Sequence, residues 1–260
     1  MREAEIALTH ILNCDRGSLY LDPGLQLDRQ KGREFSQVLL RRLAFEPLQY
    51  ILGQAEFMGL DFKVNKDVLI PRPETEILVE AALRYMKGVR SPRILDLGTG
   101  SGCIGVSLSK MLADSAISAS DISALALEVA KFNAQKHSAK IEFLQGDMFA
   151  ALDKGVLYDL IVSNPPYVAK KDMGSLALEL SYEPVLALDG GDSGLDYYRR
   201  IAFGAAGHLK PGGLLILELG FGQDAQIEGL LRESGEFEIL EKVNDYNHIA
   251  RVLVAKKGFR

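Results

Sequence analysis

The 260-residue sequence has no apolar run long enough to span a bilayer. Its first residues include Glu3 and Glu5 and contain no signal-peptide core, so we expect a cytoplasmic protein without membrane segments. The only two cysteines, Cys14 and Cys103, lie far apart and have no metal-ligand spacing. We therefore expect no metal site and interpret both cysteines as buried small residues.

An excess of basic residues is also missing. The formal net charge is −5, whereas a protein that grips many phosphates needs a basic patch. A protein or small-molecule substrate is therefore favoured over nucleic acid, although a local basic face at Arg41 and Arg42 stays open. The length, with 47% hydrophobic and 25% charged residues, fits one sizeable core plus a small extra domain.

The first part of the chain predicts a small helical domain over residues 1–50. Apolar residues recur at helical spacing over 3–12 and 33–44, and Asp22, Pro23 and Gly24 predict a turn between the two helices. Pro47 is expected to stop the second helix.

Residues 51–73 predict a linker built on a β-hairpin. Over residues 55–64, around Gly59, apolar and polar residues alternate with a period of two. A helix opening at Pro73 or Glu74 is then expected to run to Met86.

The remainder, residues 74–260, predicts a parallel α/β sheet, because strand-like runs alternate with helical stretches. The runs lie at 94–97, 117–120, 141–144, 160–163 and 214–219. Two further strands, 237–240 and 249–254, lie close together in the sequence and predict an antiparallel hairpin at the sheet edge.

A glycine loop follows the first of these strands and precedes a helix, where the backbone must turn sharply beside a ligand. The loop carries Gly98, Thr99, Gly100, Ser101 and Gly102 after Asp96. In a dinucleotide-binding loop a glycine is expected where Cys103 stands, so this loop favours a nucleoside ligand without a pyrophosphate.

Acidic residues follow the next two strands. Asp121 is suited to accept hydrogen bonds from ribose hydroxyls, and Asp147 with Met148 follows the third strand, beside the expected place of an adenine ring. Each acid alone is equally well explained as a helix N-cap. Ligands bind at the carboxyl ends of strands in such sheets, so the three strand ends together favour a binding site.

The fourth strand ends in a stiff turn formed by Asn164, Pro165, Pro166 and Tyr167. Two consecutive prolines exclude helix and sheet pairing and hold the Asn164 carboxamide and the Tyr167 ring in place. By itself this pattern also fits a strand-ending turn with a buried tyrosine.

Taken together, these motifs resemble class I S-adenosylmethionine-dependent methyltransferases, with an Asn-Pro-Pro-Tyr motif typical of amino-group methylases. Four further segments resemble the release factor N5-glutamine methyltransferases, the PrmC or HemK family, over nearly the whole chain. These segments are 47–53, 56–59, 69–76 and 183–195.

The resemblance implies a Rossmann-like α/β fold with a seven-stranded, mostly parallel sheet and an antiparallel edge hairpin, plus a helical N-terminal domain that helps hold the release factor. The implied reaction methylates the glutamine of the release factor's Gly-Gly-Gln loop and yields S-adenosyl-L-homocysteine. We expect a monomer. The implied cofactor-binding residues are Gly98, Thr99, Gly100, Ser101, Gly102, Asp121, Asp147, Met148 and Asn164, and the implied substrate-binding residues are Asn164, Pro165, Pro166 and Tyr167.

An amide nitrogen is a poor nucleophile because its lone pair is delocalised, so the main task is to position it. We expect the Asn164 side-chain oxygen and the Pro165 carbonyl to accept the two amide N–H bonds, and the Tyr167 ring to stack on the amide. These three residues are the catalytic candidates. Glu74 and Thr75 are expected either to line the cofactor pocket or to cap the helix.

Two other functions compete with this interpretation. The same motif would serve a methyltransferase acting on ribosomal-protein glutamine or on nucleic-acid amino groups, but the acidity and the absence of a basic, aromatic-rich insertion disfavour nucleic acid. A cofactor-binding module without catalysis is the second alternative, which the intact motif at residues 164–167 disfavours.

Overall fold

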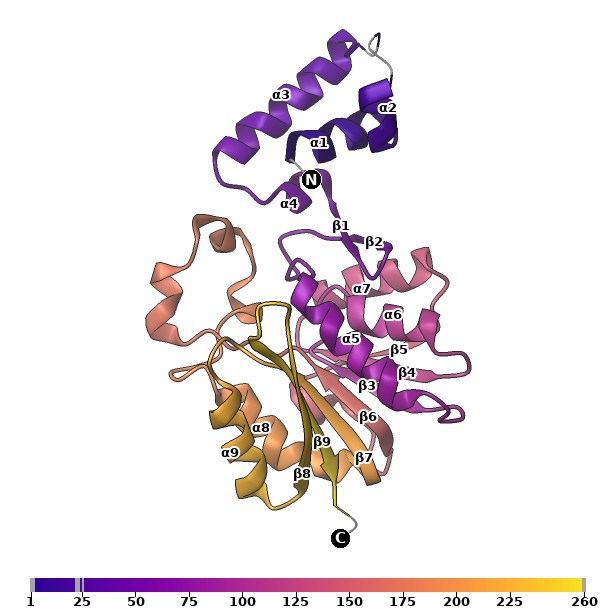
Figure 1. Ribbon diagram of the computed structural model, residues 1–260, viewed down its shortest axis with the longest axis vertical. Helices are drawn as coiled ribbons and strands as arrows, with labels where there is room; N and C mark the ends of the chain where they lie inside the picture. Colours follow the sequence, from indigo (N-terminus) through magenta and orange to yellow (C-terminus); the bar gives the residue numbers. More distant parts are fainter. Residues whose placement is uncertain (1–2, 22–23, 25, 259–260) are drawn as a thin grey trace.

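The computed structural model describes residues 3–21, 24 and 26–258 (Figure 1). A group of N-terminal helices lies at one end of a large α/β unit, and a hairpin connects the two. Asp22 and Pro23 of the predicted turn lie outside the described residues.

The N-terminal helices are α1 (Glu3–Leu12), α2 (Arg16–Leu21), α3 (Arg29–Leu43) and α4 (Leu48–Leu52). The two predicted helices are confirmed as α1 and α3, while α2 was not predicted. Helix α3 begins at Arg29, earlier than expected, because the Asp28 side chain caps it by accepting the Lys31 N–H at 2.8 Å. Pro47 does not end α3. It precedes α4, where a proline's missing N–H has no cost.

The predicted hairpin is confirmed as β1 (Gln54–Phe57) and β2 (Leu60–Lys63). Met58 and Gly59 form its turn with φ of 51° and 70°, the two left-handed residues that a tight hairpin turn requires. The predicted helix at 73–86 is confirmed as α5 (Pro73–Met86), and its Glu76 side chain accepts the Met58 N–H at 2.6 Å. This bond fastens the hairpin to the α/β unit.

The large sheet has the strand order β5-β4-β3-β6-β7-β9-β8. The first five strands in this order are parallel, and β9 runs antiparallel to both of its neighbours, β7 and β8, which confirms the predicted fold class. The strands are β3 (Arg93–Leu97), β4 (Ala116–Asp121), β5 (Ile141–Gln145), β6 (Tyr158–Ser163), β7 (Leu209–Glu218), β8 (Phe237–Asn244) and β9 (Ala250–Lys257); the helices between them are α6 (Cys103–Met111), α7 (Ala124–Lys136), α8 (Asp196–Gly204) and α9 (Asp224–Ser234).

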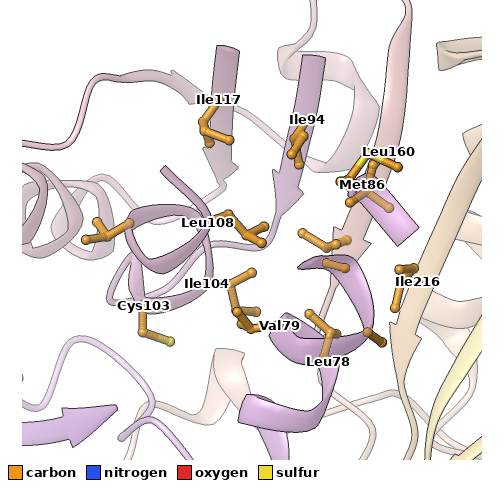
Figure 2. Close-up of a cluster of buried hydrophobic side chains, with 14 of the residues drawn as sticks. Leu78, Val79, Met86, Ile94, Cys103, Ile104, Leu108, Ile117, Leu160 and Ile216 are labelled. Carbon is orange, nitrogen blue, oxygen red and sulfur yellow. The ribbon is translucent and has the colours of Figure 1, made fainter. Parts of the chain in front are cut away.

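Both faces of the sheet are covered by helices, and the core divides accordingly. Helices α5, α6 and α7 lie on one face, where Leu78, Leu108 and Ile94 belong to one buried cluster (Figure 2). Helices α8 and α9 lie on the other face, where Tyr198 belongs to the same cluster as Leu95. Neighbouring residues of a central strand thus enter opposite cores, as a pleated strand buried on both sides requires.

The sheet has its topological switch between β3 and β6, from which the chain winds outward in both directions. The carboxyl ends of these two strands therefore border a crevice, the usual ligand position in such folds. Residues 164–195 leave β6 without a long helix and contain three short 3-10 turns at 170–175, 178–182 and 185–187.

The N-terminal helices touch this irregular segment at the end of α3. Arg42 pairs with Glu3 at 2.9 Å and also with Glu179, and the Tyr182 hydroxyl donates to the Ala44 carbonyl at 2.7 Å. The segment that follows the Asn-Pro-Pro-Tyr turn is thus in direct contact with the helical group.

The two cysteines differ in burial. Cys103 is buried, and burial raises the pKa of its thiol to about 12, whereas Cys14 is only half-buried, so its predicted burial is wrong. Within the described ranges, no helix has both the length and the apolar character to cross a membrane. In the same ranges, no three His, Cys, Asp or Glu side chains are arranged to hold a metal ion.

Candidate functional site

A cavity lies at the carboxyl ends of β3, β4 and β6, beside the start of α5. It brings together residues that are distant in the sequence. Most of the predicted site residues line it: Gly98, Thr99, Gly100, Ser101, Asp121, Asp147, Met148, Asn164, Pro165 and Pro166. Gly102 and Tyr167 are not among its lining residues.

The glycine loop is fastened to the end of β4. The N–H groups of Gly98 and Thr99 both donate to the Ser120 carbonyl at 2.9 Å. Gly102 has a different task from the cavity-lining residues, since a Cβ there would lie 3.1 Å from the Ala130 Cβ on α7. Its φ of 81° favours glycine and a Cβ would crowd α7, so Gly102 allows α6 and α7 to pack closely behind the loop.

Asp96 is fully buried and holds the glycine loop from the side of the core. Its Oδ2 accepts the Thr99 hydroxyl at 2.6 Å and the Gly105 N–H at 3.0 Å. Burial raises the pKa of Asp96 to about 6, against the opposite effect of these two hydrogen bonds. Asp96 therefore shapes the loop from inside the core and does not line the cavity.

Asp121 joins the loop to the next helix. Its Oδ2 accepts the Gly100 N–H and its Oδ1 accepts the Ser123 N–H, both at 2.9 Å. The N-cap of α7 is Ser123, so the capping alternative for Asp121 is wrong. Burial raises the pKa of Asp121, opposed by these N–H groups. Each carboxylate oxygen has a second lone pair, which leaves Asp121 able to accept further hydrogen bonds from a ligand.

Asp147 and Met148 form the corner of the cavity beyond β5. The Asp147 carboxylate pairs with Arg200 at 2.9 Å and makes no side-chain cap to the 3-10 turn that follows. Met148 has a φ of 54°, a left-handed conformation that is rare for such a side chain and that the surrounding structure must maintain.

The Asn-Pro-Pro-Tyr turn is anchored to neighbouring elements. The Ser163 hydroxyl donates to the Leu97 carbonyl at 2.7 Å and joins the ends of β6 and β3. The Asn164 Nδ2 donates to the Thr75 hydroxyl at 3.2 Å. Of the two candidates on α5, Thr75 lines the cavity, whereas Glu74 does not. Neither caps α5, whose N-cap residue Arg72 makes no side-chain cap.

Tyr167 packs against the core formed with α8 and α9. Burial raises the pKa of its hydroxyl to about 12. The backbone of the turn is covered by Gly190, whose added Cβ would lie 2.8 Å from both the Pro166 carbonyl oxygen and the Tyr167 Cα. The Gly190 N–H donates to the Val168 carbonyl at 2.8 Å. This contact keeps the turn pressed against the following loop.

Sequence reasoning missed two parts of the cavity wall. Arg72 lines the cavity and pairs with Glu183, which is 5% exposed and also accepts the Ile70 N–H at 3.2 Å. Tyr197 from α8 also lines it. No local pattern connects Arg72 with Glu183, because 111 positions separate them, and their meeting depends on the fold.

A doubly wound sheet with a glycine loop, an acid at the next strand end and an Asn-Pro-Pro-Tyr turn at one cavity defines a methyltransferase. The family model described as the methyltransferase small domain matches residues 74–191, and the model of the PrmC N-terminal domain matches residues 1–53. In fold, the chain is similar to the T. thermophilus 16S rRNA N2 G1207 methyltransferase, solved in complex with AdoMet and guanosine. That similarity has a TM-score of 0.56 and 23% identity, and covers 78% of this chain and 49% of the other.

Relatives in sequence define the family. The release factor glutamine methyltransferase of Bordetella pertussis is 43% identical over 91% of this chain and 88% of its own length. That of Koribacter versatilis is 39% identical over 98% of this chain and 90% of its own length. The chain belongs to the family of release factor glutamine methyltransferases.

Proposed function

We propose that this enzyme transfers a methyl group from S-adenosyl-L-methionine to the N5 side-chain nitrogen of the glutamine in the Gly-Gly-Gln loop of class I peptide chain release factors. The observation that carries this is the joining of the glycine loop and Asn164 in one cavity, in a chain of this family. The residues assigned to the nucleoside and the residue assigned to the substrate amide thus line the same cavity. The second product is S-adenosyl-L-homocysteine.

The cavity fits such a cofactor in the chemistry of its lining. Asp121 has acceptor capacity left for ribose hydroxyls, and Met148 offers an apolar side chain beside the expected place of the adenine. Thr99 and Ser101 line the part of the cavity assigned to the methionine group. When bound, S-adenosylmethionine supplies an electrophilic methyl group on a sulfonium.

The turn at residues 164–167 then positions the acceptor nitrogen. The Asn164 Nδ2 is engaged with Thr75, which leaves Oδ1 to accept one N–H of the substrate amide. The Pro165 carbonyl accepts the other, and both acceptors favour the positive charge that develops on nitrogen. The stacking of Tyr167 on the amide stays a prediction, since its ring is not part of the cavity lining.

A protein substrate would approach over the segment between the cavity and α3. Large apolar side chains are exposed on both sides of this contact: Leu43 is 76% and Phe45 50% exposed near the end of α3, and Leu178 is 59% exposed on the segment that follows the turn. Leu186, farther along the same segment, lines the cavity. These side chains support a role of the N-terminal helices in holding the release factor.

The acceptor is tested by incubating the enzyme with methyl-labelled cofactor and either a release factor or nucleic acid. We expect label in the release factor, and mass spectrometry should find one added methyl group on the glutamine of the Gly-Gly-Gln peptide. Ribosomal protein serves as the third substrate arm. Label in ribosomal protein or nucleic acid alone would overturn the proposed acceptor, and binding of cofactor without any transfer would support a module that does not catalyse.

Asp121→Ala tests the assigned ribose contact. Loss of the carboxylate removes a charged acceptor from the cavity and also the partner of the Gly100 N–H. We expect the dissociation constant of the cofactor to rise about tenfold, measured by titration calorimetry. Asp153→Ala, an exposed carboxylate away from the cavity, is the matched control and should bind as the wild type does. Equal affinity of the two variants would contradict the assignment.

A further inference from the structure

Gln223 contacts the end of the Asn-Pro-Pro-Tyr turn from the loop between β7 and α9. Its side-chain Nε2 donates to the Tyr167 carbonyl at 3.1 Å and to the Gly194 carbonyl at 3.4 Å. Tyr167 is the last residue of the turn, and 56 positions separate it from Gln223. Gln223 is not among the residues that line the cavity, so its effect on a substrate would pass through the turn.

The local backbone brings the Gln223 side chain to this position. The Gln223 N–H donates to the Gly220 carbonyl at 3.1 Å and closes a tight turn, in which Gly222 has a φ of 73° that favours glycine. Gln223 is then the N-cap residue of α9, but its side chain makes no cap to that helix. A side chain at this position commonly bonds the first N–H groups of its own helix. Here it bonds the Asn-Pro-Pro-Tyr turn.

Two glycines leave room for the Gln223 carboxamide. A Cβ at Gly194 would lie 2.8 Å from Nε2 and 2.5 Å from the Tyr167 carbonyl oxygen. A Cβ at Gly220 would overlap Oε1 and lie 3.0 Å from the Tyr167 Cδ2. Side chains at these positions would therefore displace the carboxamide or crowd the tyrosine. The carboxamide thus occupies a slot between Gly194, Gly220 and Tyr167.

The orientation of the carboxamide follows from its partners. Both acceptors are carbonyl oxygens, which only the NH2 group can satisfy, so Oε1 lies on the side of Gly220. Oε1 is buried and has no hydrogen-bond partner among the residues that the structure describes. An unpaired buried acceptor lowers stability and offsets what the two hydrogen bonds contribute. We therefore expect the Gln223 carboxamide to add little to the stability of the fold and to act mainly on the position of the turn.

We propose that Gln223 is a positioning residue that fixes the end of the turn at residues 164–167, and with it the acceptor groups of Asn164 and Pro165. The inference rests on the proposed function, because that function assigns these two groups to the substrate amide. Gln223 itself makes no contact with the amide. It acts through the backbone of the turn.

The turn is held at both of its ends. At its start the Ser163 hydroxyl donates to the Leu97 carbonyl at 2.7 Å, and at its end Gln223 donates to the Tyr167 carbonyl. The two prolines between these ends have a fixed φ and donate no backbone hydrogen bond, so the position of the turn depends on the ends. Without the bond from Gln223 the turn can shift. A small displacement of the acceptor groups slows methyl transfer, because the reacting atoms must be in line.

Gln223→Met removes the donors and keeps the length of the side chain. We expect kcat for methyl transfer to fall about fivefold, the scale of one lost hydrogen bond. The dissociation constant of the cofactor should equal that of the wild type, because Gln223 bonds none of the residues assigned to the cofactor. An unchanged kcat would overturn the proposal. So would a rise in the cofactor dissociation constant as large as the loss of rate, because that result indicates a general loosening of the cavity.

Gln223→Asn is the second variant and gives the same comparison if the methionine variant folds poorly. Its carboxamide is too short to reach Tyr167, but asparagine is a favoured N-cap residue for α9. We expect stability in urea at least equal to that of the wild type, together with the same loss of kcat. Ser234→Ala is the control, because it removes a side-chain bond to the Leu231 carbonyl at the other end of α9. It should keep the wild-type kcat. Wild-type kcat in Gln223→Asn would overturn the proposal.

A measurement without substrate separates this inference from the proposed function. Tyr167 and Val168 form the only Tyr-Val pair in the sequence, so ¹³C-carbonyl tyrosine with ¹⁵N-valine gives one correlated signal. The Tyr167 carbonyl ¹³C signal should move upfield in both Gln223 variants, because the carbonyl loses a hydrogen bond, and it should not move in Ser234→Ala. An unchanged signal in the Gln223 variants would overturn the positioning role even if the release factor is methylated. An upfield shift with slower transfer would support it even if the acceptor proved to be another amide.

Discussion

Asn164→Ala is expected to lower kcat for methyl transfer about 30-fold, equivalent to a barrier increase of about 2 kcal/mol. Alanine removes the Oδ1 acceptor that we assign to the substrate amide, and it leaves the Thr75 hydroxyl without its partner. Because the amide nitrogen depends on orientation for its reactivity, the loss acts mainly on the chemical step. The contacts assigned to ribose and adenine do not involve this side chain, so cofactor affinity should be nearly intact.

The measurement combines single-turnover rates on a Gly-Gly-Gln substrate with calorimetric titration of the cofactor. Asn247→Ala is the control, because Asn247 is exposed in the turn between β8 and β9, where its backbone N–H makes the contact with Asp245. It should behave as the wild type. Near-normal turnover of Asn164→Ala would remove Asn164 from the catalytic assignment.

Gly190→Ala should lower methyl transfer about 100-fold, although Gly190 does not line the cavity. The new Cβ would lie 2.8 Å from the Pro166 carbonyl oxygen and 2.8 Å from the Tyr167 Cα, and 2.9 Å from the Gly194 Cα. All three atoms belong to backbone that cannot move like the end of a flexible side chain. The turn that holds the substrate must therefore shift, and overpacking should also destabilise the fold by about 2 kcal/mol.

Gly174→Ala is a matched control in the same segment between β6 and α8, because nothing lies within 4 Å of the position of its Cβ. It should change neither rate nor stability. Rates and urea unfolding are measured for both variants, so that loss of fold is separated from loss of geometry. A Gly190→Ala enzyme with wild-type rates would show that the contact with Pro166 and Tyr167 does not position the turn.

Local sequence pattern was sufficient for most of the fold. The hairpin at Met58 and Gly59, the helix opened by Pro73 and the strands of the large sheet all follow from turn chemistry and apolar periodicity. Two of the errors in the predicted helices lie where a single residue determines where a helix begins. Asp28 starts α3 earlier than its apolar pattern indicates, and Pro47 opens α4 where it was expected only to stop a helix.

The residues of the candidate site could be predicted only in part from the local sequence pattern. Residues that follow a strand directly, such as Asp121 and Asn164, could be assigned to one sheet edge because parallel strands bring their carboxyl ends together. Gly102 belongs to the same loop, but the structure assigns it to helix packing against Ala130. Loop membership alone does not distinguish a glycine beside a ligand from a glycine beside a helix.

The sequence by itself determined the sheet, the order of its elements and the motif at residues 164–167, because these depend on contacts between near neighbours and on strand-end chemistry. Only the tertiary structure decided which side chains stand behind that motif. Thr75 contacts Asn164 from α5, and Gly190 covers the turn from a loop. Such contacts join residues far apart in the chain. Burial removes water from the polar atoms involved and leaves each of them few hydrogen-bond partners, so the role of each atom follows only from the folded structure.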